Sequence, residues 1–168
     1  ADSPIRNQLV MVLDREGNVL SGRLVTEEST IPVEPQATGW ASLPLVATAM
    51  AQGKRLVATE VVPAEYLAPV GLAEHAQVTI VDTPKAAPEL YDPREGTAGL
   101  ALLAAAPVQN DEGQVLGVVI SMHLFNNDFS LVDQIKQVAG VDTATIFFGG
   151  LRVSTNVLDE QSERAIGT

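Results

Sequence analysis

Three pairs of apolar runs, each pair joined by a short polar segment with glycine, constrain the fold of this 168-residue chain most strongly. The pairs are 9–13 with 19–20, 99–108 with 115–125, and 143–148 with 151–157. Apolar runs around such turns are typical of β-hairpins. The first two turns also resemble each other, because Asp14-Arg-Glu-Gly-Asn-Val-Leu matches Asp111-Glu-Gly-Gln-Val-Leu with a one-residue difference. The chain is therefore expected to form antiparallel sheet.

The segments between the hairpins predict helices and further strands. A helix is predicted from Trp40 to Gln52, since apolar residues recur at helical spacing and Gly53 follows as a C-terminal cap. Strands are predicted at 55–62 and 77–81, a short helical turn at 63–72, and a long proline-rich loop after residue 81. Asn126 or Asp128 is expected to cap a helix that ends at Gly140. This order predicts one antiparallel sheet with helical material on a face.

Composition excludes several classes of function. The net charge of −11 opposes binding to nucleic acid or to an anionic membrane surface, and the absence of cysteine excludes thiol chemistry and Cys-ligated metals. The usual hydrolase, P-loop, zincin and dinucleotide-binding motifs are missing, and no window has the roughly 18 apolar residues of a membrane span. A Ser–His–Asp hydrolase stays open only because such triads assemble in space. We therefore expect no enzyme activity, no cofactor and no metal in this chain.

The predicted strand 115–125 has two unlike faces. One face carries the bulky residues 116, 118, 120, 122 and 124, and it is expected to pack on a helix. The other face combines Gly117 with Ser121 and His123, a pattern typical of a sheet face that lines a small cavity. An ordinary half-exposed face is the alternative interpretation.

Several segments together resemble the Cache family, the extracytoplasmic PAS-like sensors of bacterial kinases and chemoreceptors. Residues 12–20 resemble the first hairpin of such a domain, and residues 105–119 resemble its final hairpin, with Pro-Val before an acidic-Gly turn and Val-Leu-Gly-Val-Val after it. Residues 126–140, 144–147, 152–156 and 164–168 are similar to the start of a second module in double-Cache proteins. The resemblance covers most of the chain.

The resemblance implies an α+β, PAS-like sheet of five or six antiparallel strands with flanking helices over residues 1–125. Residues 126–168 would then be the connecting helix and first hairpin of a second, truncated module, whose apolar face at Ile146 and Phe148 is expected to be covered by a partner chain or to be poorly ordered. The implied function is ligand sensing outside the cytoplasmic membrane, as part of a bacterial histidine kinase or chemoreceptor. Membrane contact would occur only through flanking segments, and the full receptor is expected to be a homodimer.

A small-molecule ligand is expected between the sheet and the segment 40–72, with carboxylates and amino acids as the candidate classes. The candidate ligand-binding residues are polar or aromatic and are expected to project toward the side covered by helix and loops: Glu60, Tyr66, Thr79, Tyr91, Ser121 and His123. Thr59 is the alternative to Glu60, since the pattern of strand 55–62 does not assign its faces. Trp40 is interpreted as core. The alternative function, from a different class, is a protein-interaction or dimerisation module that binds no small molecule.

Overall fold

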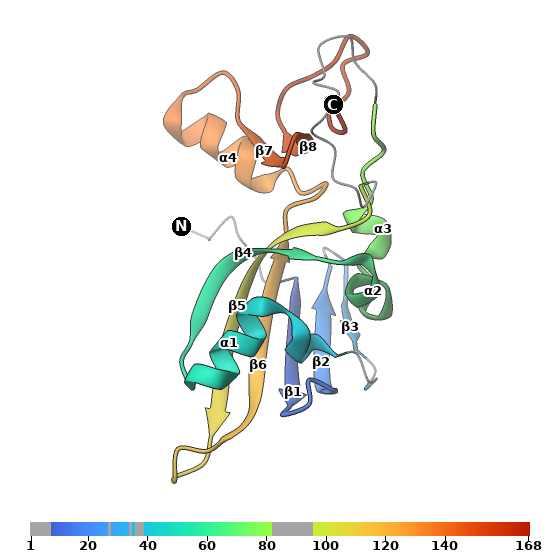
Figure 1. Ribbon diagram of the computed structural model, residues 1–168. Coiled ribbons are helices and arrows are strands. Elements are labelled where there is room, and N and C mark those ends of the chain that lie inside the picture. The colour runs from blue at the N-terminus through green and yellow to red at the C-terminus, as the bar shows by residue number, and fades with distance from the viewer. Residues whose placement is uncertain (1–7, 27, 34, 36–38, 82–95) are drawn as a thin grey trace.

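The first part of the chain forms one antiparallel sheet with six strands. The computed structural model describes residues 8–26, 28–33, 35, 39–81 and 96–168. The strands are β1 (Leu9–Asp14), β2 (Val19–Val25), β3 (Thr30–Pro32), β4 (Leu56–Val62), β5 (Gly99–Gln109) and β6 (Val115–Leu124). Their order is β3-β2-β1-β6-β5-β4, and every neighbouring pair is antiparallel (Figure 1). The predicted α+β, PAS-like fold class is confirmed.

The hairpins β1–β2 and β5–β6 share one turn chemistry. The Asp14 carboxylate accepts hydrogen bonds from the backbone N–H groups of residues 16 and 18, at 3.0 and 2.8 Å. The Asn110 side chain accepts from the N–H groups of residues 112 and 114 in the same way, at 3.1 and 2.8 Å. These side chains hold the backbone in a turn, as Asx residues commonly do. Asp14 therefore corresponds to Asn110, and the two turn sequences align without the one-residue difference.

Short helices follow β3 and the edge strand β4. They are the 3-10 turn η1 (Trp40–Ser42), α1 (Pro44–Gln52), α2 (Ala64–Leu67), the 3-10 turn η2 (Ala68–Val70) and α3 (Ala73–Ala76). The continuous helix predicted from Trp40 is wrong, since Leu43 is extended with φ −64° and ψ 130°. Pro44 causes this break because a proline disfavours helical geometry in the residue before it. Gly53 ends α1 in the left-handed conformation, as predicted.

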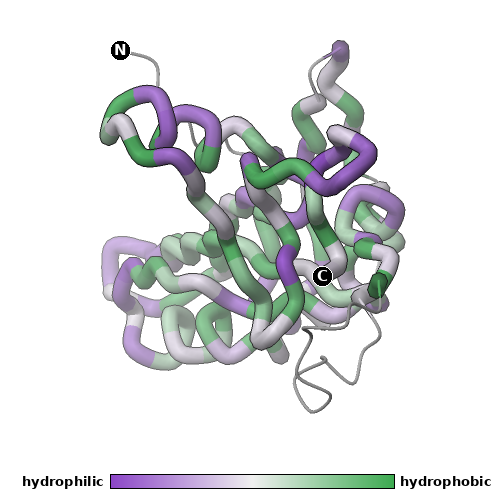
Figure 2. The backbone as a smooth tube through the Cα atoms, turned by 90° about the horizontal axis from the view of Figure 1, so that it is seen from above, coloured by the Kyte–Doolittle hydropathy of each residue, from purple (hydrophilic) through white to green (hydrophobic). Residues whose placement is uncertain are grey.

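The core lies between α1 and the bulky face of the sheet (Figure 1). The side chains of Val118, Ile120 and Met122 on β6 are fully buried, in one cluster with Val46 and Ala49 on α1. Small aliphatic side chains let the helix approach the sheet closely. Figure 2 shows the hydrophilic segments gathered at the turns, while hydrophobic stretches run through the interior. The expectation that the bulky face of β6 packs on a helix is confirmed.

The chain after β6 forms a smaller unit of one helix and one hairpin. Its elements are α4 (Ser130–Ala139), β7 (Thr145–Phe148) and β8 (Leu151–Thr155). The two strands make their own two-stranded sheet and do not pair with the first sheet, as predicted. The Asp128 carboxylate accepts the N–H of Ser130 at 2.9 Å at the start of α4. Asn126 does not cap this helix, because its side chain binds backbone groups of the first unit.

The predicted strand at residues 77–81 is absent. Its backbone makes single hydrogen bonds, from Val78 N–H to the Gly96 carbonyl at 2.9 Å and from Val81 N–H to the Gly167 carbonyl at 2.8 Å. Isolated bonds to two different segments cannot build a ladder, although the residues alternate as in a strand. This segment therefore lies beside the second unit and is no neighbour of β6.

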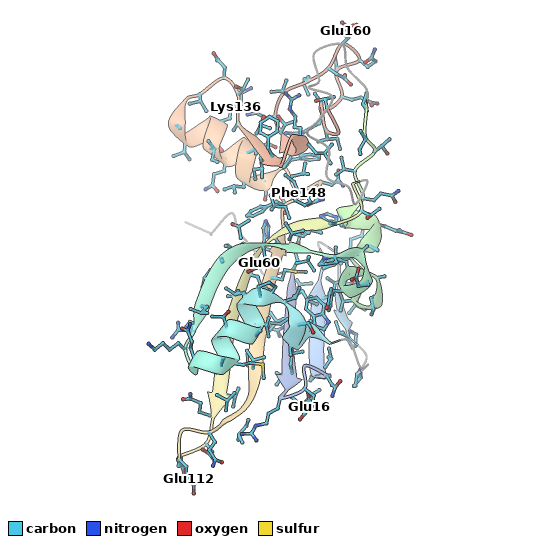
Figure 3. The ribbon with its side chains drawn as sticks, viewed as in Figure 1. Glu16, Glu60, Glu112, Lys136, Phe148 and Glu160 are labelled. Carbon is cyan, nitrogen blue, oxygen red and sulfur yellow. The ribbon has the colours of Figure 1, made fainter. Side chains whose placement is uncertain are left out.

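The apolar face of the second hairpin is covered by the chain itself. Phe148, Leu151 and Val153 are buried in one cluster with Val78 and Ala98, and Ile146 packs against that cluster. Figure 3 shows Phe148 between the hairpin and the first sheet. The expectation that a partner chain covers this face, or that it is poorly ordered, is wrong. The segment that failed to form a strand supplies the cover.

Candidate functional site

The pairing registers assign each candidate residue to a face of the first sheet. Glu60 pairs with Ala101, which pairs with Leu124, and both partners belong to the core under α1. His123 pairs with Leu102, which pairs with Thr59. Because neighbours along a strand point to opposite faces, Glu60 lies on the helix-covered face and His123 on the other. The candidate residues are thus divided between two sides.

Glu60 and Tyr66 lie on the helix-covered side. Glu60 on β4 is half-buried (Figure 3), and its carboxylate makes no hydrogen bond or ion pair with the part of the chain that the structure describes. Tyr66 on α2 packs on the core and meets Trp40 edge to face, with ring centroids 5.4 Å apart. Trp40 is fully buried in that core, which confirms its predicted role. Its indole N–H has no hydrogen-bond partner among the described residues.

Ser121 and His123 face away from α1, so the expectation that they project toward the helices is wrong. The bulky residues of β6 occupy the helix side, and alternation sends Ser121 and His123 to the opposite face. The glycine gap also has another cause. A Cβ added at Gly117 would lie 2.2 Å from the carbonyl oxygen of Leu13, so the missing side chain makes room for β1 and not for a cavity.

The remaining two candidates do not join either group. Thr79 is exposed and lies off the sheet, in the segment that runs beside the second unit. Tyr91 lies outside the residues that the structure describes. The structure therefore places Glu60 and Tyr66 on one side of the sheet, and Ser121 and His123 on the other.

Sequence reasoning missed a polar cluster that forms around His123 where the two units meet. His123 is 2% exposed, its Nε2 lies 3.5 Å from a carboxylate oxygen of Asp128, and its ring meets Phe125 edge to face. The other histidine, His75 on α3, also comes close to these groups. Burial lowers the pKa of His75 below 6.5, the charge of Asp128 opposes that shift, and His123 adds to it. Both histidines thus sit near one carboxylate.

The three residues after Phe125 tie this cluster to both units. The side chain of Asn126 accepts the N–H of Leu100 at 2.8 Å and donates to the carbonyls of Ala76 and Ala98, at 2.7 and 3.1 Å. The Asn127 side chain donates to the carbonyls of His75 and Gln77, both at 2.9 Å.

The second unit is bound at the same place. The Asn127 N–H donates to the Val153 carbonyl at 3.0 Å, and the Ser154 hydroxyl donates to the Asp128 carbonyl at 2.5 Å. These three residues, Asn126, Asn127 and Asp128, form a hub between the two units. The sequence signal for this hub was a run of Asn-Asn-Asp after a buried strand. Its side chains take over the pairing of backbone groups that no strand satisfies.

The polar groups of the described residues do not assemble a metal site. No set of three or more histidine and acidic side chains in that part of the chain is placed to hold a metal ion. The helix-covered face of the sheet is lined mainly by apolar side chains, with Glu60, Tyr66 and the indole N–H of Trp40 as its polar features.

The comparison with protein families gives one match. Residues 123–168 match the family described as single Cache domain 3, so the resemblance to Cache sensory domains is confirmed over these residues. The match begins at His123 and includes the hub, α4 and the hairpin β7–β8. Cache domains are sensory and non-catalytic, and they are typically extracytoplasmic. The double-Cache arrangement stays a prediction.

No curated protein matches the chain. Across the residues that the structure describes, none of the helices has both the length and the apolar character needed to cross a bilayer.

Proposed function

We propose that this chain is the ligand-sensing part of a bacterial transmembrane signalling receptor, such as a histidine kinase or a chemoreceptor, and that it lies outside the cytoplasmic membrane. The observation that carries the proposal is the match of residues 123–168 to a sensory Cache domain, directly after a PAS-like six-stranded sheet. A receptor of this kind works when its ligand binds one of two arrangements more tightly than the other. The receptor would act as a homodimer.

The ligand is proposed to bind on the helix-covered side of the first sheet. Glu60 supports this placement, because a half-buried carboxylate without a described partner is poised to accept hydrogen bonds from a ligand. Tyr66 offers an apolar ring with a hydroxyl beside it. An amino acid suits this pair better than a simple carboxylate, since its ammonium group would be attracted to Glu60 and a bare carboxylate would be repelled.

Ser121 and His123 stay candidates for ligand binding only on the opposite face. A ligand there would not contact α1. It would contact the part of the sheet that leads into the Asn126 hub. The two placements are distinguished by substituting one residue on each face.

A thermal-shift screen tests both the function and the placement. A small molecule that binds the folded chain must raise its melting temperature, so amino acids, carboxylates and amines are screened at millimolar concentration. For a hit on the helix side, Glu60→Gln is expected to need at least about tenfold more ligand for the same rise in melting temperature. The matched control is Thr59→Val, the neighbouring residue on the opposite face. An unchanged shift in Glu60→Gln, together with a lost shift in Ser121→Ala, would move the site to the opposite face.

The second candidate function is a protein-interaction or dimerisation module without a small ligand. The dense apolar packing under α1 favours it, since the core residues on that side are already in mutual contact. It predicts that no compound raises the melting temperature and that the chain self-associates at micromolar concentration, which light scattering coupled to gel filtration measures. Binding of a ligand to a monomer would contradict it.

A further inference from the structure

The junction between the two units contains both histidines of the chain. His75 is partly buried on α3, and its Nε2 is buried with no hydrogen-bond partner among the described residues. His123, at the end of β6, places its Nε2 3.5 Å from the Asp128 carboxylate. Burial of the His75 imidazole favours its neutral form. A second positive charge here would lack a second counter-charge.

The hydrogen bonds around His75 connect it to the second unit. Its backbone carbonyl accepts from the Asn127 side chain, and the Asn127 N–H in turn donates to Val153 on β8. A movement of α3 that exposes the imidazole would therefore pull on Asn127 and loosen its bond to the hairpin. His75, a titratable residue, is therefore bonded to Asn127, the residue whose N–H links the first unit to β8.

The charged surroundings of His75 decide the direction of the effect. The described groups that shift its pKa through their charge are Asp128, which favours the protonated form, and His123, which opposes it. The packed helix α2 carries Glu65 and Tyr66, and Glu74 precedes His75 on α3; these groups contribute no resolved shift to it. Burial is the largest cause, so the folded state favours neutral His75.

We propose that His75 is a proton-triggered latch, which holds the second unit against the first when it is neutral and loosens the junction when it takes up a proton from an acidic medium. The proton comes from solvent. The device needs no small-molecule ligand, so it goes beyond the proposed ligand-sensing function. A domain outside the cytoplasm would meet the pH of the surroundings directly, which gives such a latch a use.

Proton linkage sets the size of the effect. The junction opens to a state in which His75 has its ordinary pKa of 6.5, while burial lowers that pKa in the closed state. Proton uptake in the open state therefore increases the opening constant between pH 7.0 and 5.5, by at most about eightfold. The sign is fixed, because a lowered folded-state pKa means that stability is present above pH 6.5 and is lost as the pH falls below it.

Amide hydrogen exchange on the whole chain tests the proposal. After correction for the intrinsic pH dependence, the Asn127 amide is expected to exchange faster at pH 5.5 than at pH 7.0, by at most about eightfold, while the Met11 amide in β1 keeps its protection. In His75→Gln, which is neutral and of similar size, the acid response at Asn127 is expected to vanish. His123→Gln is the matched control, and it should keep a response.

Three results would overturn the proposal. They are an unchanged protection of Asn127 in acid, a full acid response in His75→Gln, and loss of the response in His123→Gln alone. If His75→Gln does not fold, Asp128→Asn replaces it, and the acid response must then be at least as large as in the unchanged chain, because the charge that favours protonated His75 is gone. A flat or weaker response in Asp128→Asn would also refute the latch. None of these readouts depends on ligand binding, so failure of the ligand-sensing function is recognised separately.

Discussion

Replacing Asn126 with alanine is expected to destabilise the chain more than any other single change at the junction. The side chain is 1% exposed, and its three hydrogen bonds satisfy the N–H of Leu100 and the carbonyls of Ala76 and Ala98. Alanine leaves these three backbone groups buried and unpaired. At about 1 kcal/mol for each group, the low end of the usual range because water can enter the space, the loss is about 3 kcal/mol.

Urea unfolding followed by circular dichroism measures this loss, and a melting temperature lower by about 6–12 °C should accompany it for a chain of this length. The matched control is Asn110→Ala. Asn110 also makes three side-chain hydrogen bonds, but in an exposed hairpin turn, where water replaces them. The control is expected to lose less than about 1 kcal/mol.

Hydrogen exchange adds a local readout, since the Leu100 amide should lose its protection in Asn126→Ala. Equal losses of stability in the two variants would refute the reasoning, because burial would then not decide the effect. A loss below about 1 kcal/mol in Asn126→Ala would do the same, and it would mean that the hub is not a structural link between the units.

Two further substitutions test other contacts. Gly117→Ala is expected to shift the urea midpoint by an amount equivalent to about 2 kcal/mol, because the new Cβ would meet the Leu13 carbonyl oxygen; an unchanged midpoint would contradict the close approach of β1 and β6. Asp133→Asn removes the bidentate pair with Arg164, whose N–O distances are 2.8 and 2.7 Å, and should cost about 0.5–1 kcal/mol at pH 7, since both groups are partly exposed. Hydrogen bonding to Arg164 lowers the pKa of Asp133 below 3.8, so this contribution is present above pH 3.8 and is lost as the pH falls through the folded-state pKa. In Asp133→Asn, the free energy of unfolding should therefore fall less between pH 7 and the acid side than in the unchanged chain. An equal fall in both would show that the pair with Arg164 is not responsible.

Most strands of the first sheet were predictable because each is determined locally, whereas β3 was expected to be a loop because of its prolines. Alternating apolar residues and Asx-Gly turns placed β1, β2, β5 and β6 within a few residues, and the Gly140 cap ended α4 correctly. Residues 77–81 carry the same alternation but form no strand, since a strand also needs a partner edge, and their hydrogen bonds go to Gly96 and Gly167. Local pattern says nothing about which distant segment lies alongside.

The candidate site was less predictable for a related reason. Alternation on β6 separated the residues of its two faces correctly, but it did not identify which of the two faces the helices cover. That assignment follows from packing, since the core residues of β6 (Val118, Ile120, Met122 and Leu124) bury far more apolar area on the helix side than Ser121 and His123 would. The meeting of His75 with His123 was invisible in sequence because 48 residues separate them, and the Asn126 hub that joins their segments acts through side-chain bonds to backbone, which leave no periodic signature.

The packing of the hairpin β7–β8 indicates how a change in the first unit would reach the second. A two-stranded sheet is marginal by itself in water, so this hairpin depends on the cover that it receives. That cover includes Val78 and Ala98, which lie on the first-unit side of the predicted boundary between residues 125 and 126. Val78 directly follows α3 and the carbonyls of His75 and Gln77, which the Asn127 side chain binds. Any shift of α3, whether a ligand or a proton causes it, therefore alters the support of the hairpin directly, and the second unit responds without needing a rigid connection through β6 alone.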